Sequence, residues 1–276
     1  MLKVLSEEGV ETYRKNGFLS PIRVLSEEQA AACRAELEEF EAETGGPISG
    51  SYRFKAHLLF TWVDKLIRNQ RILDAVEDVL GPDILCWNTN FFIKEPRNPG
   101  YVSWHQDATY WGLSEPEEVT AWVALTPSTV ENGAMQMIPG SHLLDQVPHN
   151  DTFAEHNMLT RGQEIAVEVN EDEARYILLE PGEMSLHHIR IFHASDPNPS
   201  DERRIGLAIR YIPTYLCQAV GETDSAALVR GVDQYGHFEL EPRPPADLDP
   251  DMLALHKRYA EQQAKVLYRG TDKTSF

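Results

Sequence analysis

A histidine and an aspartate stand two positions apart in the stretch WHQDATYWGL, which runs from Trp104 to Leu113. On a strand, residues i and i+2 point to the same face, so His105 and Asp107 could aim at one point. A neutral imidazole and a carboxylate would supply two ligands to a divalent metal, and the third must come from elsewhere in the fold. Two histidines and one carboxylate leave coordination positions open, the arrangement of non-haem Fe(II) oxygenases.

The third ligand is expected in the later segment HHIRIFHASDPNPSDERRIGLAIRY, which contains His187, His188 and His193. His193 differs from the other two because a small and polar run follows it and an arginine comes eleven residues on: Ser195, Asn198 and Arg204. His187 has the same strand parity as His193, so we expect it in the pocket beside the ligands, with His188 facing outwards.

Taken in order, these elements resemble the phytanoyl-CoA dioxygenase family over about residues 10–215. The resemblance includes the central segment VTAWVALTPSTVENGAMQMIPGSH. It implies a double-stranded β-helix core and an enzyme that depends on Fe(II), 2-oxoglutarate and O2. Such an enzyme hydroxylates an unactivated C–H bond and releases succinate and CO2.

The resemblance assigns roles residue by residue. The metal ligands would be three residues: His105, Asp107 and His193. Arg204 would bind the distal carboxylate of 2-oxoglutarate, because a planar buried carboxylate favours two hydrogen bonds from one guanidinium group. Further co-substrate contacts would come from Ser195 and Trp122, and weaker matches make Asn90 and Lys55 candidates for the pocket lining.

Asp107 also bears on the type of oxidation. Relatives that chlorinate their substrates replace this carboxylate with alanine or glycine to make room for chloride. The carboxylate is present here, so the resemblance favours a hydroxylase over a halogenase.

Composition narrows the possible substrates and partners. The chain has 276 residues and a net charge of −19, and a surface so acidic repels nucleic acid and anionic lipid. It also weighs against an acyl-CoA, whose phosphates need a basic lobe. We therefore expect a small-molecule substrate, such as an amino acid, an aminophosphonate or a natural-product intermediate. The same chemistry on an acyl-CoA, a zinc hydrolase on the same three ligands and a non-catalytic cupin-like binding protein are the alternatives.

The N-terminus lacks the apolar run of a signal peptide, and no segment approaches a membrane span of 18 apolar residues. The cysteines, Cys33, Cys86 and Cys217, form no CxxC pair, which favours reduced thiols. These features predict a cytoplasmic protein. A homodimer is expected from the resemblance alone.

The elements that position the site follow from periodicity and turn residues. We expect one domain, mainly β with flanking helices and a jelly-roll, cupin-like core. Its helical N-terminal part covers about 1–82, where Ser26 and Gln29 have the form of a capping box and Gly81-Pro82 ends a second helix. Short β-rich segments at about 83–215 form the core, and alternation from Ile205 to Tyr211 gives one strand two faces.

A helical extension is expected over about 216–276, with a final helix from about Pro250 to Arg269. The polar segment 143–175 is interpreted as an insert over one mouth of the barrel. Its surroundings contain three histidines that we expect to be solvated: His142, His149 and His156.

Overall fold

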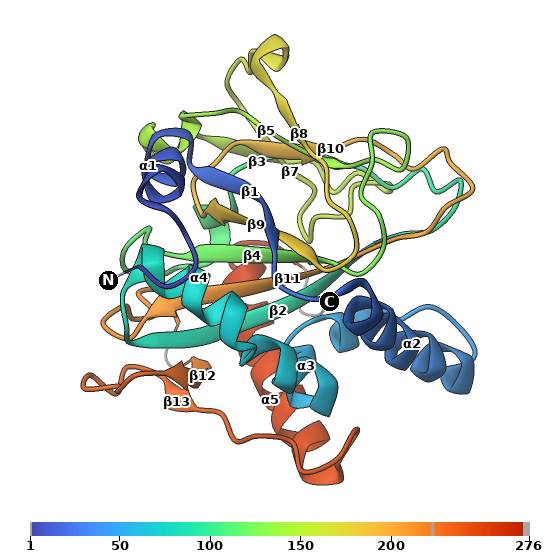
Figure 1. Cartoon of the computed structure of the whole chain (residues 1–276), viewed down its shortest axis with the longest axis vertical. Coiled ribbons are helices and arrows are strands. Elements are labelled where there is room, and N and C mark those ends of the chain that lie inside the picture. Colours follow the sequence, from blue (N-terminus) through green and yellow to red (C-terminus); the bar gives the residue numbers. More distant parts are fainter. Residues whose placement is uncertain (1, 222–223, 273–276) are drawn as a thin grey trace.

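Two mainly antiparallel sheets face each other in the computed structural model, which describes residues 2–221 and 224–272 (Figure 1). The larger sheet has seven strands in the order β1 (Phe18–Arg23), β9 (Glu183–His188), β4 (Val119–Ala124), β11 (Arg204–Pro213), β2 (Ile84–Lys94), β12 (Ser225–Arg230) and β13 (Glu239–Leu240). The smaller sheet has the order β3 (Val102–His105), β10 (His193–Ser195), β5 (Met135–Met137) and β8 (Arg175–Ile177).

Helices surround these sheets. The α-helices are α1 (Glu7–Asn16), α2 (Glu27–Thr44), α3 (Thr61–Ile67), α4 (Gln70–Leu80) and α5 (Pro250–Leu267). Short 3-10 turns are η1 (Gly50–Arg53), η2 (Ala56–Leu58), η3 (Asp107–Tyr110), η4 (Ser141–Leu143) and η5 (Glu171–Glu173). In Figure 1, α3 and α4 cross one side of the larger sheet while the smaller sheet lies on its other side.

The alternation of β11 separates the core from the site. Ile205, Leu207 and Ile209 are fully buried in the main hydrophobic cluster, together with apolar residues of α1 to α4. The opposite face of the strand points between the two sheets, where Ala208 packs against Trp122 of β4. Period-two patterning of this strand therefore sets which residues can line a cavity inside the barrel.

Local signals in the sequence begin and end the helices as expected. The Ser26 hydroxyl accepts a hydrogen bond from the Gln29 backbone N–H at 3.2 Å, and the Gln29 side chain accepts one from the Ser26 N–H at 2.9 Å. The capping box is confirmed. Asn69 caps α4, and α5 ends two residues before the expected Arg269.

Strands also occur in the parts expected to be helical. β1 lies within 1–82 and pairs with β9, while β12 and β13 lie within 216–276 and extend the large sheet next to β2. β1 is an edge strand, so Pro21 removes no required ladder hydrogen bond. The partners of these strands lie far away in the sequence, which is why local patterns did not indicate them.

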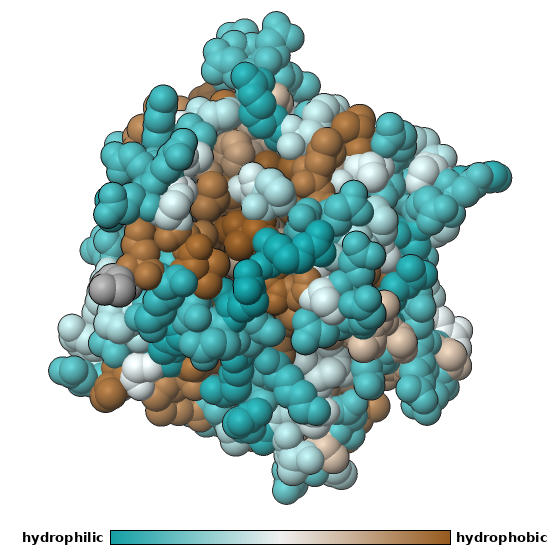
Figure 2. Space-filling model, viewed as in Figure 1, coloured by the Kyte–Doolittle hydropathy of each residue, from teal (hydrophilic) through white to brown (hydrophobic). Residues whose placement is uncertain are grey.

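The segment between η4 and β8 carries a two-stranded hairpin of β6 (His149–Asp151) and β7 (Gln163–Ile165). Hydrophilic side chains cover most of the face in Figure 2, and hydrophobic ones gather towards the middle of the view, around β1. Among the described helices, none is long and apolar enough to cross a membrane.

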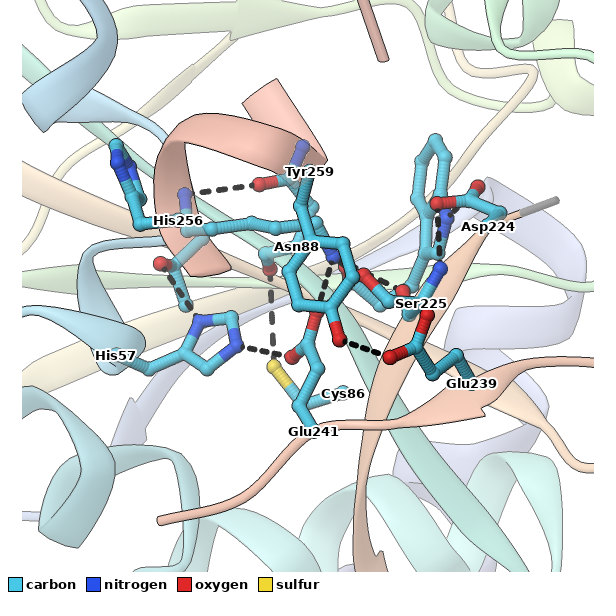
Figure 3. A network of polar contacts seen from close by, with 12 residues as sticks. His57, Cys86, Asn88, Asp224, Ser225, Glu239, Glu241, His256 and Tyr259 are labelled. Carbon is cyan, nitrogen blue, oxygen red and sulfur yellow. Dashed lines mark hydrogen bonds and ion pairs between the residues drawn. The ribbon is translucent and has the colours of Figure 1, made fainter. Parts of the chain in front are cut away.

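A buried polar network holds the C-terminal extension against the core (Figure 3). Glu241 accepts hydrogen bonds from Lys55 Nζ at 2.6 Å and Ser225 Oγ at 2.7 Å, and its other oxygen lies 2.7 Å from His57 Nε2. The Lys55 and Glu241 side chains are 2% and 0% exposed. Because both charges are buried and paired, loss of either partner would leave an uncompensated charge in the interior.

We predict that Glu241→Ala lowers the free energy of unfolding by ~3–5 kcal/mol, the usual effect of breaking a buried ion pair. Urea unfolding followed by circular dichroism measures it. Glu239→Ala is the matched control, because its ion pair with Arg258 is half exposed and should contribute ~1 kcal/mol or less. Equal effects of the two substitutions would contradict the structural role of Glu241.

Candidate metal and co-substrate site

Three side chains meet between the sheets. His105 ends β3, His193 begins β10, and the two are paired in register with ring centroids 4.0 Å apart. Asp107 begins η3, and its Oδ1 lies 3.4 Å from His105 Nε2. All three are buried, and their possible ligand atoms lie within 4.8 Å of one another. Asp107 thus reaches the common point from a turn and not from the strand expected from i, i+2 spacing.

Hydrogen bonds to the backbone orient both imidazole rings. His105 Nδ1 lies 2.9 Å from Ser103 O and 3.0 Å from His193 O, and His193 Nδ1 lies 3.1 Å from Ile191 O. A carbonyl can only accept, so each Nδ1 carries the proton and each Nε2 presents a lone pair. That tautomer is the one a metal ligand needs.

The protonation states also suit a cation. Burial lowers the pKa of His193 well below its usual value, with His105 adding to the effect, so the imidazole is neutral. Burial alone would raise the pKa of Asp107, but the neighbouring His105 side chain and the Arg210 charge lower it overall. One carboxylate and two neutral imidazoles form a donor set that fits iron.

His187 lies beside this group. Its ring centroid is 5.3 Å from that of His193, and it lines the same cavity, as strand parity predicted. Burial lowers the pKa of His187 to about 4, and its Nδ1 has no hydrogen-bond partner among the described residues. It does not belong to the group of three ligand atoms.

We call the space around these residues the inner cavity; it is lined by His105, Asp107, His187 and His193, and also by Trp122, Ser195, Arg204 and Arg210. Arg204 is buried at the start of β11, donates a hydrogen bond to Gly133 O and lies over the Trp122 ring at 5.5 Å. Its Nε has no hydrogen-bond partner in the part of the chain that the structure describes. A side chain at Gly206 would collide with the Trp122 ring, so glycine is required there.

Lys94 is a buried amine next to Ser195 and Arg204 that sequence reasoning missed. It is fully buried, lies opposite Arg204 in the ladder, and donates hydrogen bonds to Ser195 Oγ at 2.8 Å and to Asp196 O. Burial and the neighbouring Arg204 charge together lower its pKa to about 6, while Asp196 opposes them. A buried amine and a buried guanidinium lie side by side here, and neither forms an ion pair within the described residues, which favours an anion next to them.

A second space, the outer cavity, has a volume of about 240 Å³ and adjoins the first, since Phe92, Asp107 and Arg210 line both. Asn90 lines the outer cavity and not the inner one, and no described residue forms a hydrogen bond with its Oδ1. Residues 158–160 of the insert also line it. The insert therefore covers one side of the cavity next to the metal ligands.

Lys55 is not brought to either cavity. Its Nζ donates to Trp87 O, Ser225 O and Glu241, and it is 1% exposed. The prediction that it lines the pocket is therefore wrong, because Ser225 and Glu241, which bind its ammonium group, belong to the C-terminal extension, whose position was unknown from the sequence.

His149 is not a solvated loop residue either. Its Nε2 accepts a hydrogen bond from the Gln106 N–H at 3.0 Å, which supports the turn between His105 and Asp107. His142 is half-buried against Arg14 O, and His156 is exposed as expected.

Comparison with known proteins connects this geometry to a family. A sequence profile described as phytanoyl-CoA dioxygenase (PhyH) matches residues 13–206. The chain belongs to the phytanoyl-CoA dioxygenase family. A probable alpha-ketoglutarate-dependent hypophosphite dioxygenase of Stutzerimonas stutzeri is 31% identical over 200 residues, 69% of this chain and 68% of that protein. An ectoine dioxygenase of Bordetella parapertussis is 28% identical over 153 residues, and the match spans half of each protein.

Solved structures agree with this assignment. The apo form of the non-heme monooxygenase ThoJ has a TM-score of 0.84 and 36% identity, and the match covers 94% of this chain and 96% of ThoJ. The predicted family, fold class and enzyme class of this PhyH protein are confirmed. The PhyH match ends at residue 206, so most of β11 and all of the C-terminal extension lie outside it.

We predict that His193→Ala weakens Fe(II) binding by at least about 100-fold, because it removes one of three ligand atoms. Anaerobic calorimetric titration of metal-free protein measures the affinity. The exposed His156→Ala is the matched control and should bind as the unchanged protein does. Unchanged affinity in His193→Ala would move the third ligand to His187.

Proposed function

We propose that the protein is an Fe(II)- and 2-oxoglutarate-dependent dioxygenase that hydroxylates an unactivated C–H bond of a small molecule, releasing succinate and CO2. One observation supports this above the others: the same cavity holds two neutral imidazoles, a carboxylate and, at its other end, the buried and incompletely paired Arg204. The first group suits Fe(II), and the second suits the far carboxylate of a dicarboxylate co-substrate.

Each residue has a distinct task in this proposal. His105, Asp107 and His193 hold the iron and leave three positions open. When bound, iron supplies the redox centre at which 2-oxoglutarate and O2 react. Arg204 and Ser195 position the co-substrate by hydrogen bonds to its distal carboxylate, and Trp122 forms the apolar wall beside it. The depth of these groups in the barrel keeps bulk water from the reacting atoms.

Three alternatives are less well supported. A zinc hydrolase needs no buried arginine opposite its three ligands, and a non-catalytic binding protein needs no set of open coordination positions. An acyl-CoA substrate would require several cations at the mouth, whereas two arginines line the outer cavity. The relatives named above act on hypophosphite and ectoine, which are both small molecules.

The described cysteines are free, as expected for a reducing compartment. We propose a cytoplasmic location on that basis. The homodimer stays a prediction from the family.

We predict that anaerobic Fe(II) followed by 2-oxoglutarate gives the weak visible absorption band of the chelate, and that Arg204→Ala loses it at the same concentrations. Loss of a charge-assisted pair weakens co-substrate binding by ~1.5–3 kcal/mol or more. Arg97→Ala is the control, because Arg97 is an exposed arginine that forms a surface ion pair with Asp201. If folded, metal-loaded protein gave no band, the proposed function would be wrong, and the protein would be a barrel that binds metal without binding 2-oxoglutarate to it.

We predict that 2-oxoglutarate binding takes up a proton at Lys94. Its pKa of about 6 in the free protein should rise beside a bound carboxylate, so affinity is highest below pH 6 and falls as pH increases above it, by at most about tenfold per pH unit. Arg204 and the Asp196 carboxylate are the charged groups that act on Lys94. Calorimetry from pH 6 to pH 8 measures the slope, and Lys94→Met should flatten it. The same slope in both proteins would contradict the assignment.

A further inference from the structure

The outer cavity is positioned to hold the molecule that is oxidised. It shares Asp107 with the inner cavity, so a ligand within it lies next to the metal ligands. Its volume of about 240 Å³ suits a molecule of amino-acid size better than a large one. The chemistry of its walls therefore bears on the class of substrate.

The walls are cationic although the chain is strongly acidic. Of the described residues that line the outer cavity, Arg53 and Arg210 carry positive charge, and the acidic one is Asp107, which belongs to the metal site. Neither arginine takes part in an ion pair within the described parts of the chain. Two buried or half-buried guanidinium groups without an ion-pair partner in the described residues favour an anionic ligand.

Arg210 is the better buried of the two. It is 6% exposed, its Nε has no hydrogen-bond partner among the residues described, and its guanidinium lies over the Trp111 ring at 4.5 Å. Glu118 is the other carboxyl whose charge could act on it. Burial raises the pKa of Glu118 well above its usual value, with the Asp107 charge adding to the effect, so Glu118 is neutral and does not neutralise Arg210.

Arg53 approaches the cavity from η1. Its Nε donates to Phe91 O at 3.1 Å, which fixes the direction of the guanidinium, and its Nη atoms have no hydrogen-bond partner in the described part of the chain. Arg53 lines the outer cavity and not the inner one. Its effect on ligands can therefore be separated from effects on 2-oxoglutarate.

Two amides add a polar position. Asn90 of β2 and Gln263 of α5 both line the outer cavity, and Asn90 Oδ1 and Gln263 Oε1 are buried with no hydrogen-bond partner within residues 2–221 and 224–272. Unsatisfied buried amides are costly and rare in folded proteins, so a ligand group that hydrogen-bonds to them would stabilise the complex.

The wall from α5 is held in place by the insert. Arg161 Nη1 donates to the carbonyls of Leu267 and Arg269 at 3.1 and 3.2 Å, at the C-terminal end of α5. A cation at this end also interacts favourably with the helix dipole. Arg210 and Gln263 both lie beyond the part matched by the PhyH profile.

We propose that the substrate is a small carboxylate or phosphonate of amino-acid size, whose anionic group is bound by Arg53 and Arg210 and whose second polar group contacts Asn90 and Gln263. The inference rests on the proposed function, because it takes the outer cavity as the substrate chamber of the oxygenase.

The test uses the full chain loaded anaerobically with Fe(II) and 2-oxoglutarate. Three probe sets are titrated by calorimetry: small L-amino acids, the matching 1-aminoalkylphosphonates and the matching L-amino acid amides. We expect an acid or a phosphonate to bind, and its amide to bind about 30-fold more weakly or worse, since the amide lacks the charge that the arginines recognise. Binding by one acid class alone identifies the anion.

Variants then test the arginines. Arg53→Gln and Arg210→Gln should each weaken binding of that anion about 30-fold or more, Arg210→Lys less so, and the surface control Arg97→Gln should bind as the unchanged protein does. Addition of O2 should increase succinate release when the anion is present.

Several results would overturn the proposal: amides that bind as well as acids, anion binding unaffected by both glutamine variants, or no acid or phosphonate bound by the loaded protein. The proposal would also be overturned if Arg53→Gln weakened binding of 2-oxoglutarate as much as binding of the anion, because the outer cavity would then be part of the co-substrate site. Absence of the chelate band in the unchanged protein is a different failure, which removes the proposed function itself.

Discussion

The pairing of β10 between β3 and β5 fixes the orientation of both site histidines. His193 lies opposite His105, and its carbonyl is one of the acceptors for His105 Nδ1. A slip of one residue would turn His193 to the other face of the sheet and remove that acceptor together with the ligand. The tautomer, direction and separation of the two imidazoles thus depend on a single strand register.

β11 carries the anion chemistry of both cavities. Arg204 lies in the inner cavity, and Arg210, six residues on, lies where the inner and outer cavities join. Alternate residues between them pack into the main core, so the strand is held rigidly while its other face presents both guanidinium groups. Gly206 lets the Trp122 ring lie against the strand between them.

The acidic surface and the cationic interior act on different anions: the surface repels large polyanions, and the interior favours small ones. A net charge of −19 disfavours polyanions at long range, but salt screens exposed charges beyond about 10 Å. Arg204 and Arg210 are buried, where screening is weak and an unpaired cation is costly. A small anion that enters the barrel can therefore be bound by a protein whose surface is strongly acidic.

The sequence by itself determined the family and fold class, the capping box at Ser26, the two faces of β11 and, through the motif, the residues that meet in the inner cavity: His105, Asp107, His193, Ser195, Trp122 and Arg204. These features depend on local periodicity or on residues in a fixed order. Only the tertiary structure decided which other residues surround these side chains. Lys55 is captured by Glu241, Lys94 lies beside Arg204, and Gln263 reaches the outer cavity from α5. Each of these contacts joins segments far apart in the chain, and burial and pairing across such distances leave no pattern in neighbouring residues.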